Sequence, residues 1–486
     1  MKRLSRILLC ILVLLGSAIS TRAQSSILFG HAGLTDYGYR VIPATDGGFW
    51  VGGEGEDSTA QSMQYWVARF SSKGTLLWDS TYGGDATDFL WSIQPSADGG
   101  VLLAGYTGIQ WSGAETALML KLDSTGHTVA RYNCVDSVRG IHSHFVGERP
   151  QGGYMWTGHT VDPSTNYGKI VAGRLNENFE PIWQKRFPMG NFAHAHCGLA
   201  TSDGGMLIVG HTDSIQPTHD CAIRLDSNGN VLWSGIYMST LANDDEPYGL
   251  CATRSGGFAI FGGSAATNGS SSMWLLVLDA TGHTVLDKHY GLGSGWGYSG
   301  IQCSDGGFVE IGGIGTAASE IYAVKTDSVG NVEWTKTFAP AANSNGNDVF
   351  QHNNQLVMVG EATKSGQSSE LWGLFTDMKG VKAAYDASIP PAGVAGSVGS
   401  QSELTVNPNP LPSGGLATFT LPSADANSIA IYNAIGQEIY SHHIAGGALV
   451  TSWNGTTNDG SQVTEGIYVA VVRTASSAIQ TKFVVK

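Results

Sequence analysis

The amino-acid sequence predicts an all-β protein, with a seven-bladed β-propeller followed by a small Ig-like β-sandwich. Three observations lead to this prediction. The chain of 486 residues contains 66 glycines and only 14% charged residues, a composition typical of turn-rich β-structure. Two short phrases each recur seven times over most of the chain. The C-terminal part lacks both phrases and shows the pattern of a separate set of short strands.

The first repeated phrase is a hairpin turn with the sequence Asp-Gly-Gly, as in "TSDGGMLIVG" from Thr201. The Asp side chain can hydrogen-bond back to the turn, and Gly adopts a positive φ without steric penalty. Apolar and small residues alternate on both sides, as half-buried strands require. The first glycine recurs at intervals of 48 to 53 residues, at Gly47, Gly99, Gly152, Gly204, Gly256 and Gly306, with Asn354 in a degenerate seventh copy.

The second phrase is also a hairpin, of the type "IRLDSNGNVLW", which ends at Trp233. Four of its seven copies end in Trp, which we interpret as a packing anchor between neighbouring blades. Two hairpins per repeat make four strands, and seven four-stranded sheets bury their faces when they close into a ring. We therefore interpret the Asp-Gly-Gly turns as scaffold.

The propeller is expected to span residues 24–388. The segment "SILFGHAGLTDYG", near its start, resembles the fourth strand and connector of a repeat. We expect this segment to pair with the last blade, beside or instead of "GVKAAYD" near the end of the repeats. Such pairing would close the ring without a covalent bond.

The N-terminal residues 1–23 have the pattern of a signal peptide. Lys2, Arg3 and Arg6 precede an apolar stretch that is too short to span a bilayer, and Ala23 is a small residue suited to cleavage. This predicts Sec-type export to the periplasm and no transmembrane segment in the mature chain. The net charge of −14, without basic runs after the N-terminus, argues against binding to nucleic acid or to anionic membranes. Five widely spaced cysteines remain after cleavage, and their pairing stays open.

Residues 389–401 are rich in Pro, Gly, Ser and Ala, and we expect a linker there. Residues 402–486 contain about seven short strands, which suits a small β-sandwich. In this tail "NPNP", "IYNAIGQEI", "EGIYVAVVRT" and the terminal "KFVVK" resemble, in order, the motifs of the C-terminal sorting domain of the type IX secretion system. The matching residues include Asn407, Pro408, Asn409, Pro410, Gly466, Ile467, Tyr468 and Lys486.

This resemblance implies that the type IX secretion machinery recognises the tail. The protein would then be secreted or held on the outer-membrane cell surface. The propeller repeats resemble the glycine-rich propeller repeats of secreted Bacteroidetes proteins. That resemblance is a guide to fold more than to function, because propellers host enzymes, lectins and scaffolds alike.

Candidate site residues lie in the strand before each Asp-Gly-Gly turn, ten and eight positions before its first glycine. Residues two apart on a strand share one face, so equivalent pairs on adjacent blades form a belt. Six copies align, and the seventh is too degenerate. The candidate ligand-binding residues are Tyr37, Tyr39, Phe89, Trp91, Glu246, Tyr248, Trp296 and Tyr298, and the candidate metal ligands are His142, His144, His194 and His196.

Aromatic side chains suit the apolar faces of sugar rings, and neutral imidazole is a good ligand for zinc and other divalent metals. The competing interpretation is that the belt only packs blade on blade. His159 and His211, in "WTGHT" and "IVGHT", are interpreted as periodic turn residues. No nucleophile elbow, phosphate loop or zinc-protease helix motif occurs in the sequence.

Three hypotheses follow for function. The preferred one is a binding or adhesion module for a glycan or a protein, without enzymatic activity. The second is an exported metal-dependent hydrolase or lyase that uses the histidines. The third is a structural surface protein without a small ligand.

Overall fold

The structure, a computed structural model, is all-β. It describes residues 26–29, 36–57, 62–72, 74–84, 86–109, 112, 114–135, 139–162, 168–214, 218–240, 244–315, 319–341, 343–363, 369–383, 404–407, 411–412, 415–421, 428–432, 438–444, 450–458, 461–473 and 478–486. The predicted signal peptide with its cleavage site, the predicted linker and Pro408–Pro410 lie outside the described residues, so these assignments stay predictions. No helix long and apolar enough to cross a membrane is found in the described part of the chain.

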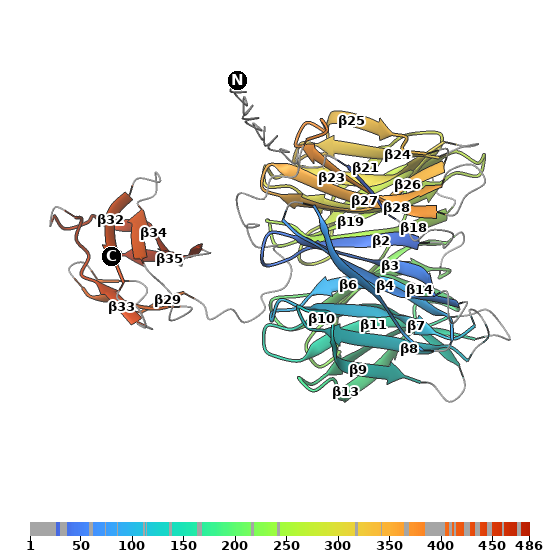
Figure 1. Cartoon of the computed structure of the whole chain (residues 1–486), viewed down its shortest axis with the longest axis horizontal. Helices are drawn as coiled ribbons and strands as arrows, with labels where there is room; N and C mark the ends of the chain where they lie inside the picture. Colours follow the sequence, from blue (N-terminus) through green and yellow to red (C-terminus); the bar gives the residue numbers. More distant parts are fainter. Residues whose placement is uncertain are drawn as a thin grey trace, which may run out of the picture.

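The repeats fold into seven four-stranded antiparallel sheets, counted over the described residues (Figure 1). Blade I consists of β2 (Asp36–Pro43), β3 (Phe49–Asp57), β4 (Ser62–Phe70) and β5 (Leu76–Tyr82). Blade II consists of β6 (Asp88–Pro95), β7 (Val101–Thr107), β8 (Thr116–Leu122) and β9 (Thr128–Cys134). Blade III consists of β10 (Gly140–Glu148), β11 (Tyr154–Val161), β12 (Ile170–Leu175) and β13 (Pro181–Phe187). Blade IV consists of β14 (Ala193–Ala200), β15 (Met206–Thr212), β16 (His219–Leu225) and β17 (Val231–Tyr237).

The remaining blades follow the same order. Blade V consists of β18 (Asp244–Ala252), β19 (Phe258–Ala265), β20 (Ser271–Leu278) and β21 (Thr284–Tyr290). Blade VI consists of β22 (Gly295–Gln302), β23 (Phe308–Ile314), β24 (Glu320–Thr326) and β25 (Val332–Phe338). Blade VII consists of β26 (Asn343–His352), β27 (Gln355–Thr363), β28 (Ser369–Asp377) and the N-terminal β1 (Ser26–Phe29).

The first strand of each blade contacts the first strand of the next, from β2 through β6, β10, β14, β18 and β22 to β26 and back to β2. The seven first strands therefore surround the axis of a closed ring, and the seven-bladed propeller predicted from the repeats is confirmed. The repeated turns form as expected. The first glycine has a φ between 81° and 90° in all six intact copies, and the Asp46, Asp98, Asp203 and Asp305 carboxylates each accept a hydrogen bond from the second glycine.

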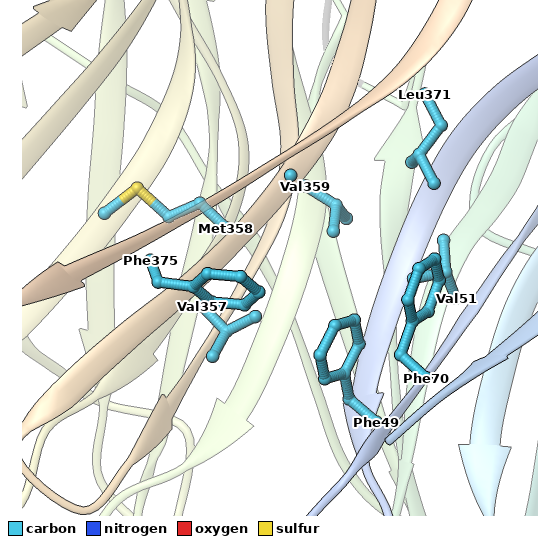
Figure 2. A pocket seen from close by; sticks show the side chains of 9 residues that line it. Phe49, Val51, Phe70, Val357, Met358, Val359, Leu371 and Phe375 are labelled. Carbon is cyan, nitrogen blue, oxygen red and sulfur yellow. The ribbon is translucent and has the colours of Figure 1, made fainter. Parts of the chain in front are cut away.

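The ring closes where β1, from the start of the chain, pairs with β28, so the N-terminal strand completes the last blade. Beside this pairing, side chains of blade I face those of blade VII in an apolar seam (Figure 2). Phe49 packs against Phe350 and Phe375, with ring centroids 6.5 and 5.8 Å apart. The space between the side chains of the seam does not admit a water molecule. The seam is thus packed like a protein interior.

The C-terminal module, drawn in orange to red in Figure 1, has two antiparallel sheets. One contains β29 (Thr405–Asn407), β30 (Ala417–Thr420) and β33 (Val450–Trp453). The other contains β32 (Glu438–His443), β31 (Ser428–Tyr432), β34 (Gly466–Arg473) and β35 (Ala478–Val485). Phe419, Trp453, Tyr468 and Phe483 form an aromatic core that no propeller residue joins among the described residues. The predicted small β-sandwich is confirmed as a small C-terminal β domain.

Candidate functional site

Every first strand carries a β-bulge at the same place. In all seven blades the pairing of the first strand with the second skips one residue, so that this residue has no partner in the ladder. The skipped residues are Tyr39, Trp91, His144, His196, Tyr248, Tyr298 and Asn347. Bulges re-aim side chains and recur next to binding and active sites. The structure therefore places one predicted belt residue at the bulge in each of blades I to VI.

The other predicted belt residue of each pair lies in the ladder two residues earlier. Tyr37 is opposite Glu54, Phe89 opposite Tyr106 and His142 opposite His159. His194 is opposite His211, Glu246 opposite Gly263 and Trp296 opposite Gly313. The six predicted pairs are thus structurally equivalent. Their role in binding remains a prediction.

Blade VII completes the belt with Asn345 and Asn347, which the sequence-based alignment missed. Its first hairpin has a tight two-residue turn between His352 and Gln355, with Asn353 at a φ of 53°. This turn is shorter than the Asp-Gly-Gly loop, so an alignment on that glycine shifts the seventh pair by one position. The bulge, which is visible only in the strand pairing, is the feature that identifies the correct residues.

Aromatic and imidazole rings of the bulged residues contact one another across blades II to VI. The Trp91 ring stacks on His144 at a centroid distance of 4.9 Å, and His144 lies 6.0 Å from His196. Tyr248 lies 5.1 Å from His196 and 5.6 Å from Tyr298. Trp91 is 36% exposed, whereas His144 is buried. The five bulged residues of blades II to VI thus form a continuous arc with Trp91 as its most accessible ring.

The rest of the predicted belt packs within or between blades. Tyr37 stacks on Tyr39 at 5.8 Å, and the Tyr39 hydroxyl donates a hydrogen bond to Glu54. Phe89 stacks on Tyr106 at 4.8 Å. Glu246 accepts a hydrogen bond from the Tyr248 hydroxyl. The Trp296 ring covers Gly263 of blade V so closely that a Cβ there would lie 2.3 Å from it.

An axial cavity of about 100 Å³ lies beside the arc. Its wall contains the bulged residues His144, His196 and Tyr248, and also residues that follow the bulge in their strands, among them Arg40, Ser92, Cys197, Ser299 and Asp348. A regular strand would turn these residues to the opposite face from the bulged residues, but the bulge puts both at the cavity. The cavity has room for several water molecules or for part of a small ligand.

Arg40 and Asp348 bring a guanidinium and a carboxyl group to the wall of this cavity. The Arg40 guanidinium reaches from blade I to the carbonyl oxygens of Asn347 and Tyr248, each at 3.2 Å. The Asp348 carboxylate accepts hydrogen bonds from the Val41 amide at 2.8 Å and from the Ser299 hydroxyl at 2.5 Å. Burial raises the pKa of Asp348, and Arg40 and these hydrogen bonds offset part of that rise.

Six histidines gather where blades III and IV meet. His142, His144 and His159 of blade III are buried, and their candidate ligand atoms all lie within 4.8 Å of one another. The equivalent residues of blade IV are His194, His196 and His211. The two sets join where His159 stacks on His194 at 3.9 Å. The predicted metal ligands therefore lie together, but the closest group of three includes His159.

The interpretation of His159 and His211 as turn residues is wrong. Both lie inside strands, β11 and β15, directly opposite the histidines of the first strands. In "GHT" the histidine follows a glycine that lets the first strand approach closely, since a Cβ on Gly158 or Gly210 would lie 1.8 Å from a carbonyl oxygen. The signal available in the sequence was that "GHT" occurs in the same two repeats whose first strands carry a pair of histidines.

Burial is the largest cause of a lowered pKa at all six imidazoles. Together with smaller effects of neighbouring groups, it gives a pKa of about 4 for His196, about 3 for His211 and about 2 for His194. At His211, Glu246 opposes the lowering of the pKa. The pKa values of His144 and His159 lie far below the usual range for the same reason. Neutral imidazoles keep a lone pair, so the cluster consists of metal-competent donors at neutral pH.

The sorting motif residues lie in the C-terminal module. Tyr468 of β34 is buried, and its hydroxyl donates a hydrogen bond to the Thr464 carbonyl oxygen at 2.7 Å. Gly466 begins β34, which also contains Ile467, and Asn407 ends β29. The amide of Lys486 donates to the Leu411 carbonyl oxygen at 2.9 Å, which ties the chain end to the module.

A family model for the CHU_C type IX secretion signal domain matches residues 415–485. The chain therefore carries a type IX secretion signal domain that engages the secretion machinery, and it is exported to the cell surface or secreted. This confirms the sorting function expected of the tail. No curated protein sequence matches the chain significantly.

Among solved structures the chain is similar to PorZ, an essential bacterial surface component of the type IX secretion system of Porphyromonas gingivalis. The TM-score is 0.39 at 12% identity, over 90% of this chain and 58% of PorZ, so the chain spans less than two thirds of that protein. It is also similar to a protein of unknown function from Dyadobacter fermentans, with a TM-score of 0.42 at 9% identity over 73% of this chain and 98% of the other. The β-propeller domain of the trilobed protease from Pyrococcus furiosus gives 0.40 at 10% identity, over 76% and 99%. At these identities and TM-scores the similarities carry no inference about function.

Proposed function

We propose that this exported propeller protein binds a glycan at the axial cavity and at the arc of bulged residues around it. The observation that carries the proposal is the bulge repeated in all seven first strands. It brings aromatic rings and polar groups to one place on the axis. Sugar rings are bound by this combination, because their apolar faces stack on aromatic side chains while their hydroxyls need hydrogen-bonding partners.

The two kinds of group are close together here. Trp91 offers an accessible ring that stacks on His144 of the cavity wall, and Tyr248 belongs both to the arc and to the cavity wall. Ser92, Ser299, Arg40 and Asp348 supply donors and acceptors beside them. With a volume of about 100 Å³ the cavity suits the end of a glycan better than an internal stretch of the chain.

The test is a glycan array probed with the folded mature chain, with and without a chelator, followed by titration of any glycan that binds. We expect chelator-insensitive binding, and a loss of affinity of at least about tenfold in Trp91→Ala, which removes the exposed ring of the arc. Leu77→Ala is the matched control, since Leu77 is 56% exposed on the outer strand β5. Absence of glycan binding, or equal affinities for Trp91→Ala and the unmutated chain, contradicts the proposal and favours a protein partner or a structural role.

A second candidate function is an exported metal-dependent hydrolase or lyase. The observation in its favour is the group of three buried histidines in blade III, because three imidazoles leave a coordination position open for water or substrate. Its test is turnover of ester, peptide and polysaccharide substrates by the metal-loaded chain. No turnover above that of a chain without metal contradicts it.

A further inference from the structure

We propose that His142, His144 and His159 form a binding site for one divalent transition-metal ion of the zinc class. Three neutral imidazoles with no thiolate among them suit Zn²⁺ and related ions that prefer nitrogen ligands. A tetrahedral ion with metal–nitrogen distances of about 2.0–2.1 Å holds its nitrogens about 3.3 Å apart. The candidate atoms here lie within 4.8 Å of one another, so modest rotations of the rings bring them onto the ion.

The ligands are oriented by groups around them. The His159 Nδ1 atom lies 3.4 Å from the Ala195 carbonyl oxygen, and a hydrogen bond to this oxygen leaves the lone pair on Nε2. Metal-ligating histidines almost always have such a partner on the nitrogen that does not bind the metal.

Two further observations point to a ligand. The buried Nε2 atom of His144 has no hydrogen-bond partner within the described part of the chain, and a buried polar atom without a partner is costly. The Glu115 carboxylate, fully buried, lies 3.7 Å from His142 Nε2. A carboxylate behind a histidine is the usual outer partner in zinc sites.

Simple packing explains these residues less well. The equivalent positions in blade II hold Phe89 and Tyr106, which stack on each other. Aromatic rings fill this space without buried nitrogen atoms. Replacing such rings by imidazoles adds polar atoms to a buried site, which is unfavourable unless they bind something.

Blade IV provides an internal comparison. Its equivalent histidines are engaged with each other, since His196 Nε2 lies 2.9 Å from His211 Nδ1 in a hydrogen bond. The group of three candidate ligands, by contrast, lies in blade III. The ion is therefore placed in blade III, and His211 becomes the control for His159 at the equivalent position.

The test uses the untagged mature chain after removal of metal. Addition of Co²⁺ should produce the visible absorption of a tetrahedral ion, and Zn²⁺ titration followed by desalting and elemental analysis should give one ion per chain. His144→Gln and His159→Gln should each weaken Zn²⁺ binding by about a hundredfold or more. Glu115→Gln should weaken it by about 10- to 100-fold. His211→Gln should leave affinity within about threefold of the unmutated chain.

A measurement on the unmutated chain tests the site even if the variants do not fold. X-ray absorption of the Zn²⁺-loaded chain should show three imidazole ligands, and saturating Zn²⁺ should raise the Tm. Three results overturn the site: less than stoichiometric metal after desalting, a ligand set without three imidazoles, or an equal loss in His211→Gln and His159→Gln. The glycan proposal is independent, because its binding is expected to persist in chelator.

Discussion

Arg224 Nη2 lies 2.6 Å from Asp203 Oδ2, and this ion pair joins the two repeated phrases of blade IV. Asp203 belongs to the Asp-Gly-Gly turn and Arg224 to "IRLDSNGNVLW". The same pairing occurs in blade II between Lys121 and Asp98, at 2.9 Å, and in blade VI between Lys325 and Asp305, at 2.8 Å. The Arg224 side chain is only 9% exposed, whereas that of Asp203 is 54% exposed. The turn aspartate thus neutralises a cation buried in the blade.

Asp203→Asn should destabilise the propeller, because it leaves the Arg224 guanidinium buried without a counter-charge. We expect a loss of roughly 1–2 kcal/mol in the free energy of unfolding, below the cost of breaking a fully buried pair because Asp203 is half exposed. Chemical denaturation of the mature chain measures it.

Asp226→Asn is the matched control in the same blade. The Asp226 carboxylate accepts hydrogen bonds from the Asn228 and Asn230 amides, and an Asn side-chain oxygen can accept them too. A loss for Asp226→Asn as large as that for Asp203→Asn would show that turn geometry, and not charge, is what the aspartate contributes.

Glu54 makes the propeller less stable as the pH rises. Burial raises the pKa of Glu54 to about 8 from an ordinary value of 4.5, although hydrogen bonds from Tyr39 and the Leu90 backbone offset part of the rise. The folded state therefore keeps the carboxyl neutral while the unfolded chain ionises it. The stabilising contribution is complete below pH 4.5 and is lost as the pH rises through 8, by at most about 1.4 kcal/mol per pH unit.

Glu54→Gln removes this titration and keeps a neutral side chain of the same shape. We expect the Tm of Glu54→Gln to exceed that of the unmutated chain by an amount that grows from pH 5 to pH 8. Parallel melting curves over that range measure the difference. A difference that does not change with pH would mean that Glu54 has the same protonation state in the folded and unfolded chains.

Trp233→Ala should weaken the contact between blades IV and V. The Trp233 indole donates a hydrogen bond to the Ala280 carbonyl oxygen at 3.0 Å and covers Gly282, where a Cβ would lie 2.8 Å from the ring. We expect a loss of roughly 1–3 kcal/mol, since Trp233 is half buried. Leu232→Ala, at a neighbouring position that is 56% exposed, should change the stability little. Equal losses for the two variants would argue against the anchor, and denaturant titration distinguishes them.

The architecture was predictable because each blade repeats its turn chemistry. A glycine with positive φ marks every intact first hairpin, an aspartate that bonds back to the turn marks four of these six, and the spacing of the glycines counts the blades. Blade VII was harder to align because its hairpin uses Asn353 in a shorter turn. Its fourth strand, β1, comes from the other end of the chain, and only the resemblance of "SILF" to a blade strand indicated the pairing.

The candidate site was predictable only in part, because its geometry depends on a break in the strand pattern. Alternation along a regular strand places Arg40 and Asp348 away from the axis, but the bulge before each of them turns them to the cavity. His159 was misassigned because its contact with His142 depends on the register between two strands, which no pattern within one strand contains. The pattern within single strands identified the belt residues. The pairing between strands determined which other residues lie beside them.

Removal of β1 should open the ring. In the pairing with β28, Ser26 lies opposite Leu374 and Phe29 opposite Leu371. The loss of β1 therefore exposes the backbone of β28 as an edge strand beside the seam of blades I and VII. We expect a chain that starts at residue 30 to be less stable by roughly 2–4 kcal/mol than one that starts at residue 24, from the loss of several ladder hydrogen bonds. The Tm of the propeller measures this loss.

The control is a chain that ends at residue 383, because the C-terminal core shares no buried residue with the propeller among the described residues. This shorter chain should keep the propeller Tm, whereas equal Tm values for the chains that start at residues 24 and 30 would mean that β28 needs no partner to close the ring.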